Sequence, residues 1–226
     1  MSVAACAALV ERADPDRFRA IMAAPVAART VLFPVFAFNV EVSRAPWVTQ
    51  EDMIAEMRLQ WWRDALEEIG SGGTVRRHEI VDALAPVLDA EGVRVLDRLV
   101  AARRWDIYRD AFEDEAHLSD YLDATSAGLI WAAARALGSA EEEVVRTFGW
   151  AVGAANLLRA AAALDAQGRK PLVDGTHDGI RGLAQEALDR LDRAARDRSA
   201  VSRMASASLL TGWQARPLLR PCETRR

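Results

Sequence analysis

Apolar residues recur every three to four positions along almost the whole chain, which is the spacing of one face of an α-helix. Alanine, leucine, arginine and glutamate fill most of the other positions, and runs of β-branched residues are short. The pattern predicts helices at residues 16–23, 26–44, 51–69, 76–90, 93–112, 117–137, 141–166, 178–198 and 201–215. The sequence is therefore that of an all-α protein.

No repeat, low-complexity block or change in composition divides the chain. The glycine-rich segment at residues 70–74 is the most flexible joint, but it leaves too short an N-terminal piece to fold by itself. Hydrophobic residues make up 51% of the 226 residues, which is enough for one large core. We therefore expect a single domain that covers residues 1–226.

Charge and cysteine content limit the partners and the compartment. The formal net charge is -4 and no basic block is present, which argues against a nucleic-acid partner. Cys6 and Cys222 lie at opposite ends, as expected for free thiols in a reducing compartment. The first residues lack the features of a signal peptide. We expect a cytoplasmic protein.

The C-terminal segment at residues 205–226 leaves a second location open. It combines apolar residues with several arginines, so it would suit the surface of an anionic membrane. It would equally suit an ordinary final helix with a basic tail, which we favour. A peripheral position at the inner membrane is therefore the alternative to a purely cytoplasmic one.

Nearly every residue from 147 to 164 is small or apolar, and only Asn156 and Arg159 interrupt this run. Its length approaches that of a short membrane span, but its polar residues and its glycines favour a buried central helix. Asn156 and Arg159 are three residues apart and share a face, while Gly149 and Gly153 allow another backbone to approach closely. Arg159 requires either a carboxylate partner or an anionic ligand.

Two earlier segments, "RTVLFPVFAFNVEVSRAP" and "EDMIAEMRLQWWRDALEEI", place polar and aromatic side chains at helical spacing. In "EDMIAEMRLQWWRDALEEI", Arg58 and Trp62 lie along the edge of an apolar stripe. That stripe contains Ile54, Met57, Trp61, Ala65 and Ile69. Such residues are more often core aromatics and paired arginines than ligand contacts. If they instead border a ligand cavity, the candidates are Arg29, Phe36, Asn39, Glu41, Arg58 and Trp62, together with Asn156 and Arg159.

Several familiar kinds of site are not supported by the sequence. His78, His117 and His177 are scattered without the spacing of metal ligands. No phosphate-binding loop, dinucleotide fingerprint or Ser-His-Asp signature stands out. The helical carboxylates are interpreted as solvated side chains; they include Asp106, Asp110, Asp120 and Asp123.

Taken in order, five segments resemble the squalene/phytoene synthase family of head-to-head prenyl transferases. They are "DPDRF", "ARTVLFPVFAFNVEVSR", "MRLQWWRDALEEI", "WDIYRDAFEDEAHLSDYLDATSAG" and "GWAVGAANLLRAAAALDAQGRKPL". The resemblance implies an isoprenoid-synthase fold, in which helices surround a deep apolar cavity for prenyl chains. For active members it also implies two DxxxD-type motifs on facing helices. Their carboxylates hold Mg²⁺, which neutralises the diphosphate leaving group.

This sequence departs from the family at both motifs. The matching positions hold Ser43, Arg44, Trp47, Ala160 and Leu164. Glu41 is the nearest substitute in the first motif, and Asp165 in the second comes one residue late, which turns it by about 100° around the helix. We therefore predict no catalytic residue, no metal site and no cofactor.

The segments "FAFNVEV" and "MRLQWWRDALEEI" resemble one branch of the family in particular. That branch is similar to the mitochondrial assembly factor of respiratory complex I, and it keeps the fold without the aspartate motifs. The resemblance implies a protein partner in respiratory-chain assembly.

Three functions stay open, and we favour the first. It is a non-catalytic protein whose cavity binds a prenyl or other lipid ligand, or a protein partner. The second is an active transferase that makes squalene-like or phytoene-like products, with Glu41 and Asp165 holding Mg²⁺. The third is a plain helical interaction module whose cavity has filled in.

Overall fold

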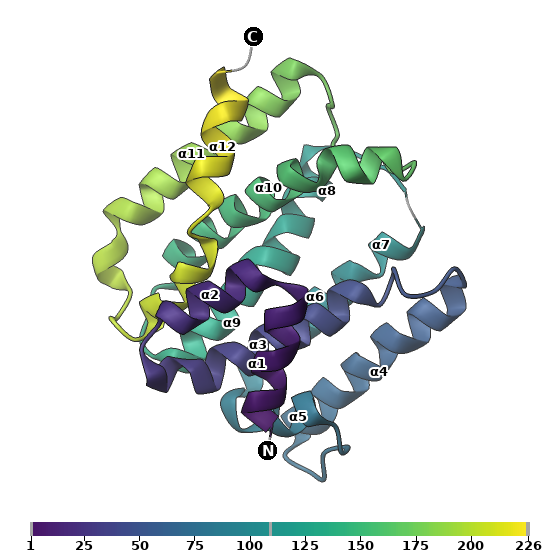
Figure 1. The fold of residues 1–226 in the computed structure, drawn as a ribbon, viewed down its shortest axis with the longest axis vertical. Helices are drawn as coiled ribbons and strands as arrows, with labels where there is room; N and C mark the ends of the chain where they lie inside the picture. The colour runs from purple at the N-terminus through teal and green to yellow at the C-terminus, as the bar shows by residue number, and fades with distance from the viewer. Residues whose placement is uncertain (1, 109, 225–226) are drawn as a thin grey trace.

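The computed structural model describes residues 2–108 and 110–224, and this part of the chain is built from helices (Figure 1). The longer helices are α1 (Ser2–Ala13), α2 (Pro15–Ala23), α3 (Val26–Arg44), α4 (Asp52–Ser71), α6 (Ala90–Arg103), α9 (Gly128–Leu137), α10 (Glu142–Ala166), α11 (His177–Arg196) and α12 (Ala215–Thr224). The shorter elements are α5 (Glu79–Leu84), α7 (Trp105–Tyr108), α8 (Glu115–Leu122), the π-helix η2 (Asp123–Ala127), and the 3-10 helices η1 (Ala85–Val87), η3 (Arg198–Ala200) and η4 (Ala205–Gly212). The predicted all-α class is confirmed.

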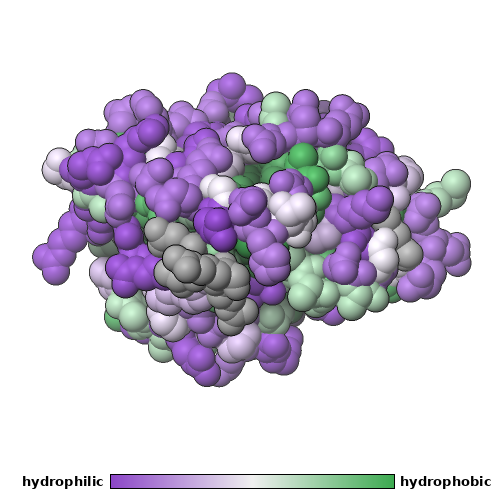
Figure 2. Space-filling model, turned by 90° about the horizontal axis from the view of Figure 1, so that it is seen from above, coloured by the Kyte–Doolittle hydropathy of each residue, from purple (hydrophilic) through white to green (hydrophobic). Residues whose placement is uncertain are grey.

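Helices α3 and α10 form the middle of the fold. Figure 1 shows α1 beside α3, and α11 and α12 beside α10, in agreement with the contacts between these elements. Helix α4 packs against α6. Seen from above, hydrophilic side chains cover most of the surface, and apolar residues show in a hollow between them (Figure 2).

The helix predicted at 76–90 is wrong, and a proline explains the difference. Helix α5 ends at Leu84, and a short 3-10 turn around Pro86 follows. Proline lacks the amide proton that an α-helix needs and clashes with the preceding turn. The chain then starts α6 with Asp89 as its cap, whose Oδ1 accepts from the backbone nitrogen of Gly92 at 2.8 Å.

Three other expected boundaries also differ. The helix predicted at 93–112 breaks near Arg103 into α6 and the single turn α7, and the one predicted at 117–137 contains the π-helix η2. The segment at 201–215 folds mainly as the 3-10 helix η4, α1 was not predicted, and α12 was expected only as a final helix somewhere within residues 205–226.

The apolar stripe predicted on α4 is rotated in the structure. The buried residues are Ala55, Leu59, Trp62, Ala65 and Leu66. Two of the predicted stripe residues are instead exposed: Ile54 by 39% and Met57 by 67%. Helix α4 carries apolar residues on two faces, and the face around Leu59 is the one that packs against the rest of the fold.

Helix α10 lies very close to the π-helix η2, as the glycines at 149 and 153 predicted. A Cβ atom on Gly149 would lie 2.6 Å from Cα of Ala127, and one on Gly153 would lie 2.8 Å from Cβ of Ser126. The Ser126 hydroxyl donates to the carbonyl oxygen of Gly149 at 2.7 Å. This close crossing sets where the second half of α10 runs.

Three segments could associate with a membrane by their composition, and each packs at least in part into the fold. Residues 149–155 of α10 are buried, as expected for a central helix. By length and composition α3 could cross a membrane, but 61% of its apolar window is buried, as in the core helix of many globular proteins. In α12, Leu219 is fully buried and Arg216 pairs with Asp192 at 2.5 Å. Part of the apolar surface of the C-terminal segment is therefore packed within the protein, whereas Leu210 and Trp213 are 40% and 54% exposed.

Candidate functional site

A cavity of about 360 Å³ lies between the C-terminal parts of α3 and α10, with α7, α8 and η2 along its wall. Its volume is at the lower end of the range of about 300–1,000 Å³ that is usual for small-molecule sites. The expectation of a filled-in cavity, on which the third function depends, is therefore wrong.

Four of the five positions that the sequence resemblance matched to the family's acids line this cavity. Ser43 and Trp47 come from the end of α3 and the turn after it, and Ala160 and Leu164 come from α10. We call these residues the four motif positions. The fifth, Arg44, is exposed and pairs with Glu41 at 3.6 Å. Ala160 and Leu164 share a face of α10, and the turn after α3 brings Trp47 to the same cavity as Ser43. None of the four side chains is a carboxylate.

Three further candidates also line the cavity: Asn39, Asn156 and Arg159. Asn39 is only 6% exposed, and its Oδ1 has no hydrogen-bond partner among the described residues. A buried acceptor without a partner costs about 1–3 kcal/mol, so this site favours an additional donor.

Arg159 is not the buried arginine that the apolar run suggested. Its side chain is 48% exposed, because α10 leaves the core after Ala155. Its guanidinium donates to Gln214 Oε1 at 3.0 Å and to Asn156 Oδ1 at 3.2 Å, and lies 3.7 Å from Asp16 Oδ2. These contacts supply the carboxylate partner that was one of its two predicted roles.

Three candidates on α3 do not border the cavity. Glu41 is two residues from both Asn39 and Ser43, which places it about 200° around the helix from them. Phe36 is 1% exposed and belongs to the core. Arg29 lies near the start of the helix, and its Nη2 donates to the carbonyl oxygen of Met22 at 2.6 Å.

The two candidates on α4 are also outside the cavity. Arg58 is exposed, whereas Trp62 is 5% exposed and packs edge-on against Phe38 at 5.3 Å between ring centroids. His78 contacts the same indole at 5.3 Å. The structural interpretation of Trp62 as a core aromatic therefore describes it best.

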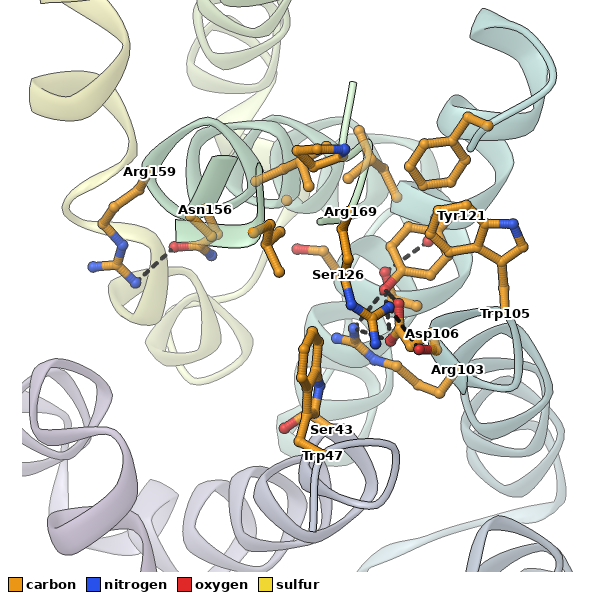
Figure 3. Close-up of a pocket in the computed structure, with 18 of the residues that line it drawn as sticks. Ser43, Trp47, Arg103, Trp105, Asp106, Tyr121, Ser126, Asn156, Arg159 and Arg169 are labelled. Atoms are coloured by element: carbon orange, nitrogen blue, oxygen red, sulfur yellow. Dashed lines mark hydrogen bonds and ion pairs between the residues drawn. The ribbon is translucent and has the colours of Figure 1, made fainter. Parts of the chain in front are cut away.

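A polar cluster of Arg103, Asp106, Tyr121 and Arg169 lines the wall of the cavity and was missed in the sequence (Figure 3). Arg103 Nη1 donates to Asp106 Oδ2 at 3.0 Å and to the Tyr121 hydroxyl at 2.6 Å. That hydroxyl donates to Asp106 Oδ1 at 2.9 Å, and Arg169 Nη1 donates to the main-chain carbonyl oxygen of Asp106 at 2.7 Å. Asp106 is 7% exposed, so its interpretation as a solvated side chain is wrong.

Burial and mutual contact fix the charges within the polar cluster. Burial by itself would lower the pKa of the Arg103 guanidinium, but its interactions with Tyr121 and Asp106 outweigh burial and raise that pKa above its usual value. Burial raises the pKa of the Tyr121 phenol, and Asp106 raises it further against the opposing effect of Arg103. Arg103 is therefore a cation and Tyr121 a neutral hydroxyl over the whole physiological range.

Trp47 fills space next to the polar cluster. The Arg169 guanidinium carbon lies 4.0 Å from the centroid of its ring, and Figure 3 shows the indole beside the guanidinium groups of Arg169 and Arg103. Trp105 and Phe112 stack at 4.0 Å further along the wall. An indole thus occupies one of the positions that the sequence resemblance matched to a carboxylate.

The lining of the cavity is rich in positive charge. Its cationic side chains are Arg17, Arg103, Arg159, Arg169 and Lys170. Its carboxylates, among the residues that the structure describes, are Asp106 and Asp110. An excess of cations in a concave site produces a positive potential that attracts anions.

The lining does not fit a Mg²⁺ cluster. Mg²⁺ prefers several oxygen ligands in octahedral geometry, but the Asp106 oxygens already accept from Arg103 and Tyr121. Glu41 and Asp165 do not line the cavity. Across residues 2–108 and 110–224, no three His, Cys, Asp or Glu side chains form a group able to hold a metal ion.

Little in the sequence could have revealed the polar cluster. Arg103 and Asp106 are three residues apart, which is the spacing of a helical ion pair. Their contacts with Tyr121 and Arg169, however, span 18 and 63 residues and depend on the folded chain.

Comparisons with known proteins give one family and one fold. The family model for squalene/phytoene synthase matches residues 10–221. The crystal structure of a dehydrosqualene synthase in complex with ligand superposes with a TM-score of 0.79 at 14% identity, over 95% of this chain and 83% of that one. The crystal structure of squalene synthase HpnC from Alicyclobacillus acidocaldarius superposes with a TM-score of 0.78 at 19% identity, over 97% of this chain and 92% of that one. The isoprenoid-synthase fold is thereby confirmed.

The curated relatives carry a different description. The chain is 29% identical over 195 residues to the Drosophila melanogaster homolog of NADH dehydrogenase (ubiquinone) complex I, assembly factor 6, covering 82% of this chain and 58% of that protein. It is 22% identical over 220 residues to the Homo sapiens complex I assembly factor 6, covering 91% of this chain and 62% of that protein. The chain therefore spans about three fifths of the length of these relatives.

Proposed function

The chain belongs to the squalene/phytoene synthase family, and on this basis we propose that it is a non-catalytic member that acts in the assembly of a respiratory NADH dehydrogenase. One observation carries the proposal. Ser43, Trp47, Ala160 and Leu164 line the cavity, so it offers no carboxylate at the four positions that the resemblance matches to the family's metal ligands.

The chemistry explains why these four positions matter. Prenyl transfer in the family begins when an allylic diphosphate ionises, and Mg²⁺ held by carboxylates stabilises the charge that leaves. A serine hydroxyl is a weak ligand, and indole, methyl and isobutyl groups are none. We propose that this chain has no cofactor and performs no transfer.

The assembly role is supported by the relatives at 29% and 22% identity, which are described as complex I assembly factors. We propose that the partner is a protein of the NADH dehydrogenase or of its assembly machinery. We also propose a location in the cytoplasm or at the periphery of the inner membrane, and a lipid-like ligand for the cavity.

The catalytic alternative has a direct test. The purified protein is incubated with Mg²⁺ and farnesyl or geranylgeranyl diphosphate, beside an active squalene synthase as positive control. We expect no release of pyrophosphate and no C30 or C40 product. Formation of such a product, lost in Glu41→Gln or Asp165→Asn, would establish the transferase alternative and overturn the non-catalytic proposal.

The assembly role is tested in the organism that encodes the protein. Deletion of the gene is expected to lower NADH:quinone oxidoreductase activity and the amount of assembled complex on native gels. The wild-type gene and the double variant Glu41→Gln, Asp165→Asn should both restore them, because neither carboxylate borders the cavity. Unchanged enzyme activity after deletion would contradict this role.

A further inference from the structure

We propose that the cavity binds a single-chain amphiphile with an anionic phosphate or carboxylate headgroup, and that the protein's own cationic side chains hold this headgroup directly, without a metal ion. The inference rests on the proposed function, because a cavity that still held a metal cluster would bind its ligand through the metal. It adds the chemical class of the ligand and the end of the cavity at which its charge lies.

The first argument is the sign of the charge in the lining. Cationic side chains outnumber carboxylates by five to two among the described residues that border the cavity. Arg169 is 9% exposed and Asp106 is 7% exposed, so part of this charge is shielded from water. Charge-assisted hydrogen bonds to phosphate or carboxylate are strong in such surroundings. The same lining would repel a free divalent cation.

The second argument is that polar groups in the cavity lack partners. The Oδ1 atom of Asn39 and the Nε atom of Arg103 are buried and have no hydrogen-bond partner among the described residues. Both residues line the cavity, and Asn39 is 6% exposed. A headgroup oxygen would accept from Arg103. The Asn39 amide nitrogen can donate to the same headgroup, whereas its Oδ1 requires a donor that a deprotonated headgroup does not supply.

The third argument is the apolar remainder of the lining. Its aliphatic residues are Leu122, Leu129, Leu157, Ala160 and Leu164. Two of these are motif positions, so where the resemblance expects acids this chain offers Ala160 and Leu164 as a wall for a hydrocarbon tail. The volume of about 360 Å³ suits one small ligand rather than two prenyl chains.

The arrangement of the side chains locates the headgroup. Figure 3 shows Arg103 and Arg169 together beside Asp106 and Trp47, whereas Arg159 and Asn156 point toward the opposite side. Lys170 follows Arg169 in the chain and also lines the cavity. The headgroup therefore lies at the polar cluster and Lys170, and the tail runs along α10.

Three probes separate the contributions of charge and tail. Binding to the full-length protein is followed by calorimetry and by the fluorescence of Trp47 and Trp105, both of which line the cavity. The probes are dodecyl phosphate below its micelle concentration, dodecanol with the same tail, and inorganic phosphate with the same charge. We expect dodecyl phosphate to bind at least about tenfold more tightly than either of the others, as one charge-assisted contact allows. We expect EDTA and Mg²⁺ to leave its affinity unchanged.

Matched variants test which side chains hold the headgroup. Arg169→Gln and Lys170→Gln should each lower the affinity for dodecyl phosphate by about tenfold and leave the affinity for dodecanol unchanged. Arg58→Gln removes an exposed arginine outside the cavity and should change neither affinity. Lys170 is exposed, so its variant keeps the test valid if Arg169→Gln fails to fold.

The possible failures of the two proposals are distinguishable. Equal affinity for dodecanol, a requirement for Mg²⁺, or no binding of dodecyl phosphate would each overturn the anionic-ligand inference. None of these results bears on the deletion experiment, which tests the assembly role. A C30 or C40 product would overturn the non-catalytic proposal whatever the binding results.

Discussion

The polar cluster and the four motif positions border one cavity, but they differ in their charge and in their hydrogen bonds. In the polar cluster, two guanidinium groups, a carboxylate and a phenol are held by contacts of 2.6–3.0 Å. Among the four motif positions, only Ser43 carries a side-chain oxygen. Its hydroxyl already donates to the main-chain carbonyl oxygen of Val40 at 3.1 Å. One region is rich in buried charge and the other has none.

This difference shows that the cavity exists without carboxylates at the four motif positions. In a metal-dependent member, facing carboxylates would need cations to bind an anion. Here the carboxylates are absent from the motif positions and the remaining lining is predominantly cationic. The cavity is therefore suited to anions by itself.

The largest effect is expected where the polar cluster loses its carboxylate. Asp106→Asn leaves the Arg103 guanidinium buried without its ion-pair partner. Removal of one member of a buried pair costs about 3–5 kcal/mol, so the free energy of unfolding should fall by about that amount in urea titrations. Asp120→Asn changes an exposed carboxylate on α8 and should alter the free energy of unfolding by less than about 0.5 kcal/mol. Similar values for the two variants would contradict the contrast drawn between the regions.

A smaller change in the free energy of unfolding is expected at the close crossing of α10 and η2, which positions Ala160 and Leu164 at the cavity. Gly149→Ala would place a Cβ 2.6 Å from the Ala127 backbone and force α10 away from η2. Overpacking of this kind costs about 1–3 kcal/mol, measurable by thermal or urea unfolding. Gly182→Ala on α11 meets no atom within 4 Å and should stabilise the protein by about 0.4–1 kcal/mol. Stabilisation by Gly149→Ala would show that the crossing is looser than it is in the structure.

The third effect appears only at alkaline pH, because the chain contains two tyrosines in different surroundings. A hydrogen bond to Glu56 raises the pKa of Tyr108, and burial raises the pKa of Tyr121. Above the ordinary tyrosine pKa of about 10, the unfolded chain loses protons that the folded chain retains, so the free energy of unfolding falls as pH rises.

Ultraviolet titration of the phenolate absorbance checks this expectation. In Tyr108→Phe, the remaining signal from Tyr121 should appear only as the protein unfolds. In Tyr121→Phe, the exposed Tyr108 should titrate while the protein is still folded. Ionisation of Tyr121 at an ordinary pKa would mean that the polar cluster is open to water.

Helical spacing predicted much of the fold, because it depends on residues close in sequence. The predicted range 26–44 is that of α3, and 141–166 differs from α10 by one residue. The errors arise where local signals compete. Pro86 ends α5 early, and α4 has two apolar faces between which only its tertiary contacts decide.

The site was predictable to the extent that it follows fixed spacing along one helix. Residues four apart share a face, so the positions of Ala160 and Leu164 on the cavity follow from the family's motifs. The polar cluster does not follow in this way, because Arg169 reaches Asp106 across 63 residues. The exposure of Arg159 was also hidden, since the sequence does not show where α10 leaves the core.

The smallest effect is expected at Arg159, the arginine that the sequence made most conspicuous. Its side chain is 48% exposed, and its charged partner Asp16 is 3.7 Å away and itself 33% exposed. Exposed ion pairs contribute about 0–1 kcal/mol, so Arg159→Ala should lower the free energy of unfolding by less than about 1 kcal/mol in urea titrations. The double variant with Asp16→Ala should show a coupling below about 0.5 kcal/mol. A loss of more than about 2 kcal/mol would mean that Arg159 is held as tightly as the polar cluster, and the contrast between the two sides of the cavity would then fail.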